Sequence, residues 1–241
     1  MHPQQRLRAY VAEAVGTALL LTAVVGSGIM GERLAGGNVG LALLANTVAT
    51  GAALVAIILT FGSVSGAHLN PAVTIADATQ RGLPWSQVPG YVVAQIGGAF
   101  SGVFAAHLMF GEPVFAFSDH ARAGLPQMFS EFVATFGLVS VIWGCARKRP
   151  DAVPFAVGAY IVAAYWFTAS TSFANRAVTL ARAATNTFAG IRPVDVGPFI
   201  VAQLLGAAAA TALFRWLVPS FPAIADDVVV PPESKDRHVR A

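Results

Sequence analysis

Charged residues are scarce in this chain of 241 residues. Asp, Glu, Lys and Arg together make up 11% of it, against about a quarter of an average soluble domain. Hydrophobic residues make up 56%, and the mean hydropathy is +0.64. This composition predicts an integral membrane protein that is surrounded by the lipid bilayer. The net charge of +3 is small and dispersed, so we expect no nucleic-acid partner.

Residues that carry chemistry are also few. The single cysteine, Cys145, excludes an internal disulfide and a thiolate metal site. Serines occur at 62–66, but Ser65 lacks the glycine two positions earlier that a Gly-x-Ser-Gly protease motif needs, and no carboxylate is placed to orient His68. An intramembrane hydrolase is therefore disfavoured. We expect no catalytic residue, no metal and no cofactor, and hence not an enzyme.

Long apolar runs are abundant instead. Six segments reach the roughly 20 apolar residues that cross a bilayer, near 9–30, 39–62, 87–110, 128–146, 152–171 and 196–218. Arg6 and Arg8 before the first run could belong to a secretory signal, but Glu13 lies inside the run and five spans follow, which favours a retained span. Two shorter pieces, near 70–80 and 175–186, predict half-helices that enter the membrane without crossing it.

Each half-helix begins at an asparagine. In the segment 65–76, Asn70 is a good N-cap, and Pro71 suits the first helical position because its φ is preset. The segment 173–181 repeats Asn, Ala, Val, Thr and Ala in register around Asn175. Irregular backbone at membrane depth is tolerated only inside the protein or along a cavity. The two capped half-helices therefore predict a pore or site at the membrane midplane.

The repeat extends to the spans around the motifs. Residues 12–17 match 130–135, and residues 91–97 match 199–205. Each half is thus span, span, half-helix and span. Because each half has three full spans, the second half enters the membrane from the opposite side, and the repeats are inverted. We expect one channel domain, 1–220, made of halves 1–126 and 127–220, followed by a disordered tail, 221–241.

Six spans in two inverted halves, each with a half-helix opened by an Asn-Pro-Ala (NPA) type motif, resemble the major intrinsic protein family of aquaporins and aquaglyceroporins. The resemblance covers residues 9 to about 218, and the context Ser-Gly-x-His-x-Asn-Pro-Ala-Val-Thr carries it most specifically. It implies an all-α membrane protein with six transmembrane helices and two re-entrant half-helices. It also implies a homotetramer with one pore per subunit.

The resemblance places the pore centre at the two motifs: Asn70, Pro71, Ala72, Asn175, Arg176 and Ala177. The two half-helices direct partial positive charge toward the midplane and repel cations. The side-chain amides of Asn70 and Asn175 can donate to a passing neutral solute. His68 is expected to line the pore on the cytoplasmic side, with a local loop contact as the alternative. Asp77 and Arg182 are expected at opposite mouths, either as solvated charges or to steer solutes.

Glu13 and Glu131 occupy equivalent positions in the two halves. Carboxylates at membrane depth need partners. In the family such glutamates accept hydrogen bonds from the backbone of the re-entrant loops, and this bracing role explains both copies. A proton relay is the alternative, but it would not require the symmetry.

Four positions set selectivity in this family. Counted from the motif asparagines, they fall on Thr50, Ala163, Ser172 and Val178. Family members commonly have an aromatic residue at the first and arginine at the last. Valine removes the fixed charge, and small residues elsewhere predict a wide filter without arginine. Such a filter passes glycerol, urea, arsenous acid or other metalloid hydroxides, and water is a further candidate. The resemblance to bacterial members associated with arsenic handling adds methylated arsenicals.

Arg176 stands where the family has proline. Arginine adds a cation beside a positive helix end. Its side chain could enter the lumen, pair with a carboxylate or disturb the fold. A channel fold that no longer conducts is therefore an open alternative, as is a coupled secondary transporter, since inverted repeats and broken helices occur there too.

Basic residues in short loops indicate the orientation. The expected inner segments carry more arginine and lysine than the outer ones, with Arg147 and Lys148 among them. We therefore expect both termini in the cytoplasm and a location in a bacterial inner (plasma) membrane.

Overall fold

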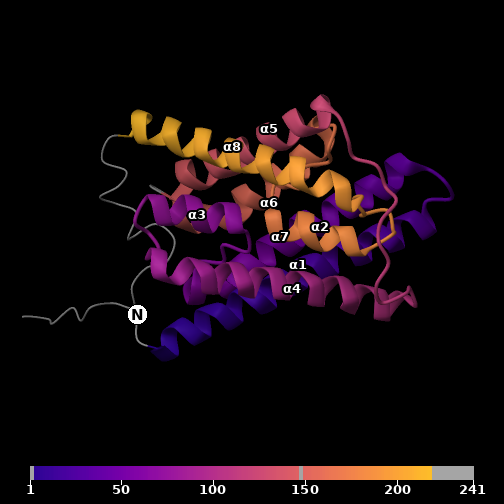
Figure 1. Cartoon of the computed structure of the whole chain (residues 1–241), viewed down its shortest axis with the longest axis horizontal. Coiled ribbons are helices and arrows are strands. Elements are labelled where there is room, and N and C mark those ends of the chain that lie inside the picture. Colours follow the sequence, from indigo (N-terminus) through magenta and orange to yellow (C-terminus); the bar gives the residue numbers. More distant parts are fainter. Residues whose placement is uncertain (1–2, 147–148, 219–241) are drawn as a thin grey trace, which may run out of the picture.

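The structure is a computed structural model that describes residues 3–146 and 149–218. These residues form helices and loops and contain no strand. The α-helices, labelled in Figure 1, are α1 (Pro3–Leu34), α2 (Val39–Ser65), α3 (Pro71–Thr79), α4 (Val88–Phe110), α5 (Leu125–Ala146), α6 (Val153–Phe167), α7 (Arg176–Ala181) and α8 (Pro193–Leu217). Three 3-10 turns are η1 (Trp85–Gln87), η2 (Pro150–Ala152) and η3 (Arg182–Ala184). The expected tail 221–241 and the basic pair Arg147 and Lys148 lie outside the described residues.

Six helices match the six expected spans. Five helical segments, namely α1, α2, η1 with α4, α5 and α8, are long and apolar enough to cross a membrane. The sixth, α6, has 15 residues and ends at Phe167, earlier than the expected 152–171. It ends there because the next residue, Thr168, is extended with φ −111° and ψ 137°. The chain then turns back into the loop that leads to α7.

The two expected half-helices are also present. Helix α3 has 9 residues and α7 has 6. Each begins directly after its motif asparagine. Their N-terminal ends meet in the middle of the molecule, with α3 and α7 pointing to opposite ends (Figure 1). A polar loop precedes each of them, and both loops lie inside the ring of long helices.

Glycines allow the long helices to pack closely. A side chain at Gly98 or Gly102 of α4 would overlap the carbonyl oxygens of Ala14 or Ala18 in α1. In the second half, a side chain at Gly206 of α8 would overlap the carbonyl oxygen of Phe132 in α5. Small residues let helix backbones approach each other in membranes. The repeat therefore also shows in the packing, where α1 pairs with α4 and α5 pairs with α8.

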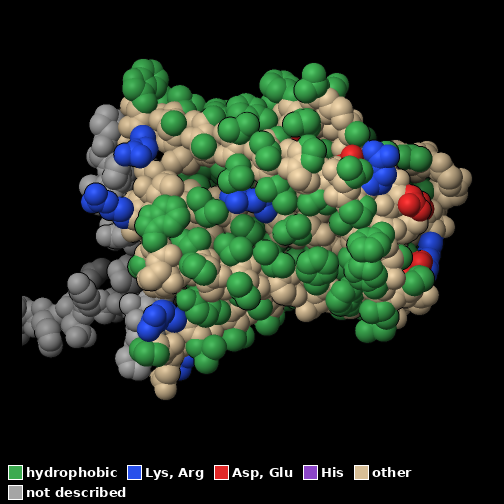
Figure 2. All heavy atoms as spheres, viewed as in Figure 1, with side chains coloured by type: hydrophobic (Ala, Val, Ile, Leu, Met, Phe, Trp, Pro, Cys, Tyr) green, Lys and Arg blue, Asp and Glu red, His purple; other side chains and the backbone are tan. Residues whose placement is uncertain are grey.

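The outer surface is apolar. Large hydrophobic side chains are exposed along α4 and α8, among them Val93, Leu108, Val201 and Leu205. Figure 2 shows hydrophobic side chains spread over the face formed by α3, α4, α7 and α8, with most charged side chains near the two ends. A water-soluble protein would not expose such a surface, whereas lipid covers it without cost.

Candidate functional site

The two motif asparagines are tied to each other's loops. The Nδ2 atom of Asn70 donates to the carbonyl oxygen of Ala174 at 2.8 Å, and Nδ2 of Asn175 donates to that of Leu69 at 2.7 Å. At the same time, each Oδ1 accepts a backbone N–H from the first turn of its own half-helix. Each amide keeps one N–H free of these bonds, because an amide nitrogen carries two hydrogens. The remaining N–H is available to a solute.

The loops before the asparagines have the same unusual backbone. Leu69 and Ala174, one residue before each asparagine, have φ of 51° and 47°. Ala67 and Ser172, three residues before, have φ of 46° and 50°. Residues other than glycine adopt this left-handed region only when their surroundings enforce it. Hydrogen bonds to Glu13 of α1 and Glu131 of α5 hold the two loops in this conformation.

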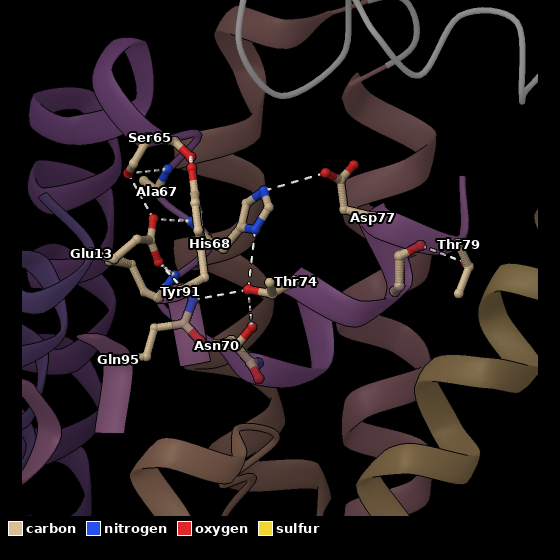
Figure 3. A network of polar contacts seen from close by, with 12 residues as sticks. Glu13, Ser65, Ala67, His68, Asn70, Thr74, Asp77, Thr79, Tyr91 and Gln95 are labelled. Atoms are coloured by element: carbon tan, nitrogen blue, oxygen red, sulfur yellow. Dashed lines mark hydrogen bonds and ion pairs between the residues drawn. The ribbon is translucent and has the colours of Figure 1, made fainter. Parts of the chain in front are cut away.

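Glu13 of α1 holds the first loop from behind (Figure 3). Its carboxylate is buried and accepts from Ser65 Oγ at 2.6 Å, from the backbone N–H of His68 at 2.9 Å and from that of Leu69 at 2.7 Å. Gln95 of α4 donates to the same carboxylate at 2.7 Å. Four donors thus surround one anion at membrane depth. These four hydrogen bonds compensate the negative charge of the carboxylate.

Glu131 of α5 holds the second loop in the same way. It accepts from the backbone N–H groups of Phe173 and Ala174 at 2.8 Å and 2.9 Å, and from Nε2 of Gln203 at 2.7 Å. Gln203 also donates to Thr179 Oγ1 at 2.8 Å, as Gln95 does to the matching threonine of the first half. The bracing is therefore symmetric in the two halves.

His68 lies beside the first motif in a polar cluster (Figure 3). Its Nδ1 is 3.1 Å from Thr74 Oγ1, and its Nε2 is 3.6 Å from Asp77 Oδ2. The ring also packs against that of Tyr91, with the centroids 5.2 Å apart. His68 lines the central cavity described next, so it combines a local loop contact with a lumen position. Asp77 is 1% exposed and is not a solvated mouth charge.

A cavity of about 330 Å³ joins the two motifs. Both motif asparagines line it, together with residues of α1, α2, α5 and α6, whereas no described residue of α4 or α8 does so. Its wall is mostly apolar. The lining includes Leu20, Val24, Thr50, Leu54, His68, Asn70, Val73, Leu138, Val157, Ile161, Tyr165, Ser172, Asn175, Val178 and Arg182.

The cavity follows the whole length of α6. Val153, Val157, Ile161 and Tyr165 of this helix all line it. They are four residues apart and share one face, because an α-helix has 3.6 residues per turn. At a rise of about 1.5 Å per residue, the stripe is roughly 18 Å long. The cavity is therefore elongated along α6 rather than confined to the two motifs.

Comparisons of the sequence with known proteins agree with this arrangement. The chain matches the family model "Major intrinsic protein" over residues 1–161. Over 218 residues it is 54% identical to Aquaglyceroporin AqpS of Rhizobium meliloti (strain 1021). The matched region covers 90% of this chain and 93% of that protein. The chain belongs to the major intrinsic protein family. This is a family of membrane channels, so the predicted family and class of protein are confirmed.

Further members of the family agree. Aquaporin Z of Bradyrhizobium diazoefficiens is 30% identical over 231 residues, covering 88% of this chain and 93% of that protein. The X-ray structure of the aquaglyceroporin from Plasmodium falciparum superposes with a TM-score of 0.70 at 19% identity, over 90% of this chain and 99% of the other. At this low identity the superposition shows the fold alone, and the shared fold confirms the predicted aquaporin-like architecture.

Three of the four positions counted for this family line the cavity, namely Thr50, Ser172 and Val178. The fourth, Ala163, does not. Its side chain is exposed on the outside of α6, while Ile161 and Tyr165 line the lumen. Two residues along a helix correspond to a rotation of about 200°, which puts Ala163 on the opposite face. The aromatic Tyr165 therefore takes the place expected for a small residue, with its hydroxyl 3.4 Å from Thr50 Oγ1.

Arg182, which the sequence predicts at a mouth of the channel, lines the lumen. It lies one turn beyond Val178, lines the cavity and is 2% exposed. Its guanidinium stacks on the ring of Phe173, with the centroid 3.4 Å away, and Nε donates to the carbonyl oxygen of Ala189. Its Nη1 is buried without a hydrogen-bond partner. The channel lacks arginine at Val178, but its lumen is not free of arginine.

Arg122, from the connection between α4 and α5, packs on the same ring. Its guanidinium lies 4.9 Å from the ring centroid of Phe173. It donates to the carbonyl oxygens of Gly190 and Ser170 at 2.9 Å and 3.1 Å. Burial lowers the pKa of Arg122 to about 10, so it stays protonated at neutral pH. The residue fastens the connection between α4 and α5 to the second re-entrant loop.

Arg176 does not enter the lumen. Its side chain lies in a separate groove between α3 and α8, and Nη2 is 3.4 Å from the carbonyl oxygen of Pro71. Arg176 and Val178 are two residues apart and so point to opposite sides of α7. Pro71 and Ala177 do not line the cavity either. Of the six residues assigned to the pore centre, the two asparagines are those with lumen-facing side chains.

Proposed function

We propose that the chain is a passive channel for small uncharged solutes such as glycerol, urea and arsenous acid, with methylated arsenicals and water as further candidates. The observation that carries this is the elongated cavity along α6, which both motif asparagines line. Its apolar wall suits solutes without charge, and its few donors can replace part of a solute's hydration. The name of the 54% identical relative, an aquaglyceroporin, supports the same solute class.

The selectivity filter in this proposal consists of Thr50, Tyr165, Ser172 and Val178, with Arg182 next to it. Val178 leaves space where the family's arginine would project. Arg182 instead contributes positive charge from the wall of the lumen, which disfavours cations without narrowing the passage at Val178. Tyr165 adds an aromatic wall beside Thr50. The proposed filter is therefore open at Val178, narrowed by Tyr165 and unfavourable to cations.

Two bracing glutamates, rather than a proton relay, complete the proposal. The donors to Glu13 and Glu131 are Ser65 at the end of α2, the re-entrant loops and the adjacent glutamines. Releasing or taking up a proton in each cycle would break these bonds. A coupled transporter is thus disfavoured. We further propose a homotetramer in a bacterial inner membrane, with both termini in the cytoplasm.

Stopped-flow light scattering on proteoliposomes tests the function. Sucrose reports water efflux, and gradients of glycerol, urea and arsenous acid report solute entry. We expect glycerol entry well above that of empty liposomes and insensitive to imposed pH and sodium gradients. Rates equal to empty liposomes for every solute would favour the non-conducting alternative, and accumulation driven by a gradient would favour a transporter.

A further inference from the structure

A second cavity lies on the outer surface, between α3 and α8, which run side by side in Figure 1. It has a volume of about 570 Å³ and is separate from the central lumen. Its floor is made of small residues of the two helices. Its lining consists of Ala72, Ile75, Ala76, Thr79, Arg176, Leu204, Ala207, Ala208, Thr211, Ala212, Arg215 and Trp216.

The groove begins at Arg176, whose charge lacks a counterion there. The Nε atom of Arg176 is buried without a hydrogen-bond partner, and Nη2 has only the 3.4 Å contact to the carbonyl oxygen of Pro71. No Asp or Glu of the described chain lines the groove. A guanidinium at membrane depth is costly unless it is paired or reaches the interface. The described residues that line the groove therefore offer Arg176 no counterion.

The groove ends at Arg215 and Trp216, near the end of α8. Both residues are exposed. Tryptophan and arginine at helix ends are typical of the membrane interface. This end of the molecule is also where α1 begins, on the left in Figure 1. The groove thus leads from a half-buried arginine to the membrane surface on that side, with an arginine at each end.

We propose that this groove binds an anionic phospholipid of the leaflet at that end. The phosphate lies at the interfacial end of the groove beside the guanidinium of Arg215, and one acyl chain lies on the floor formed by Ala72, Ala76 and Ala207. The charge of Arg176 attracts the anionic headgroup from the other end of the groove. Guanidinium groups bind phosphate through paired N–H donors, and basic pockets between transmembrane helices select anionic headgroups. The apolar floor adds the acyl chain, so a free phosphate ion satisfies only part of the site. This proposal does not depend on the solute that the channel carries.

Native mass spectrometry of the purified protein tests it with two lipids of identical acyl chains, phosphatidylglycerol and phosphatidylcholine. We expect selective retention of phosphatidylglycerol. The variants Arg176→Gln and Arg215→Gln should each lower this retention about five-fold, the effect of one arginine near an anionic lipid surface. Arg176→Lys keeps the charge and should retain an intermediate amount. Arg6→Gln is the matched control, because Arg6 is an exposed arginine on α1 at the same end.

Four outcomes would overturn the proposal. One is equal retention of both lipids by folded protein. Another is loss of lipid in Arg6→Gln as large as in the groove variants. The third is binding of inorganic phosphate or soluble glycerol phosphate as tight as that of the lipid, which would mean an ion site without an acyl component. The same spectra report the oligomer. If the groove variants change subunit number while lipid retention stays constant, the groove is a contact between protein subunits instead.

Discussion

Gln203 donates a hydrogen bond from Nε2 to Oε2 of Glu131 at 2.7 Å, and Gln95 makes the same bond to Glu13 at the same distance. The glutamine thus fixes the orientation of the carboxylate that holds each re-entrant loop. Each glutamine Nε2 also donates to a threonine of the half-helix in the same half, namely Thr74 in α3 or Thr179 in α7. Loop, spanning helix and half-helix are thereby joined at one point in each half.

Glu131→Gln should destabilise the protein by roughly 1–3 kcal/mol, the cost of a buried polar group that loses its partner. The NH₂ group of the new glutamine would face N–H groups that now donate to the carboxylate, so at least one of these hydrogen bonds would be lost. Glu13→Gln should have a similar effect because the contacts repeat. Thermal unfolding in detergent, followed by intrinsic fluorescence, measures this. Glu32→Gln is the control, since Glu32 is exposed. Equal melting temperatures for all three variants and wild type would contradict the bracing role.

Tyr165→Ala should widen the filter and raise glycerol flux several-fold relative to water flux. The tyrosine ring lines the lumen beside Thr50, and removing it enlarges the passage. Ala163→Val on the outside of the same helix should leave both fluxes unchanged. Stopped-flow light scattering at equal protein density measures the two ratios. A change in Ala163→Val together with none in Tyr165→Ala would restore Ala163 to the filter.

Arg182→Met should make the channel leakier to protons and small cations, because it removes the charge in the lumen wall. Arg182→Lys keeps a cation and should remain tight. Proton entry is measured with a pH-sensitive dye in liposomes under a potassium diffusion potential. Since the methionine variant also loses the stacking on Phe173, its elution as a single species on size exclusion is checked first. Equal proton entry in wild type and folded Arg182→Met would contradict the assignment.

Arg176→Pro, which restores the family's residue, should leave glycerol flux unchanged in liposomes of neutral lipid. The Arg176 side chain lies in the outer groove and not in the lumen. Flux normalised to protein content by quantitative immunoblot decides this. A clear rise in flux would mean that the arginine obstructs the lumen in the membrane.

The sequence was sufficient to predict the fold because the signals that determine it repeat. Asn70 and Asn175 cap half-helices in matching places, and Glu13 and Glu131 occupy matching positions in their spans. Two copies of the same pattern make a chance match improbable. The inverted arrangement follows from three full spans per half.

The lumen-facing side of the helices was harder to predict. The count to Ala163 crosses the loop 168–174, where Thr171 and Ser172 have left-handed φ, so a fixed offset does not preserve helical phase across it. Arg182 lies where α7 passes into a 3-10 turn, which changes the direction of the side chain from that of a continuous α-helix. The direction of the Arg176 side chain can be predicted from the sequence, because Val178, two residues later, is expected to face the lumen.

The most direct test of the central claim is to block the lumen at Val178. In a background where Cys145 is replaced by serine, Val178→Cys places the only thiol in the cavity wall, while Ala163→Cys places it on the outside. Glycerol flux is measured in proteoliposomes before and after a membrane-permeant thiol reagent, and mass spectrometry confirms the modification. We predict that modified Val178→Cys loses most of its flux and that modified Ala163→Cys keeps it. Full flux through fully modified Val178→Cys would contradict the account.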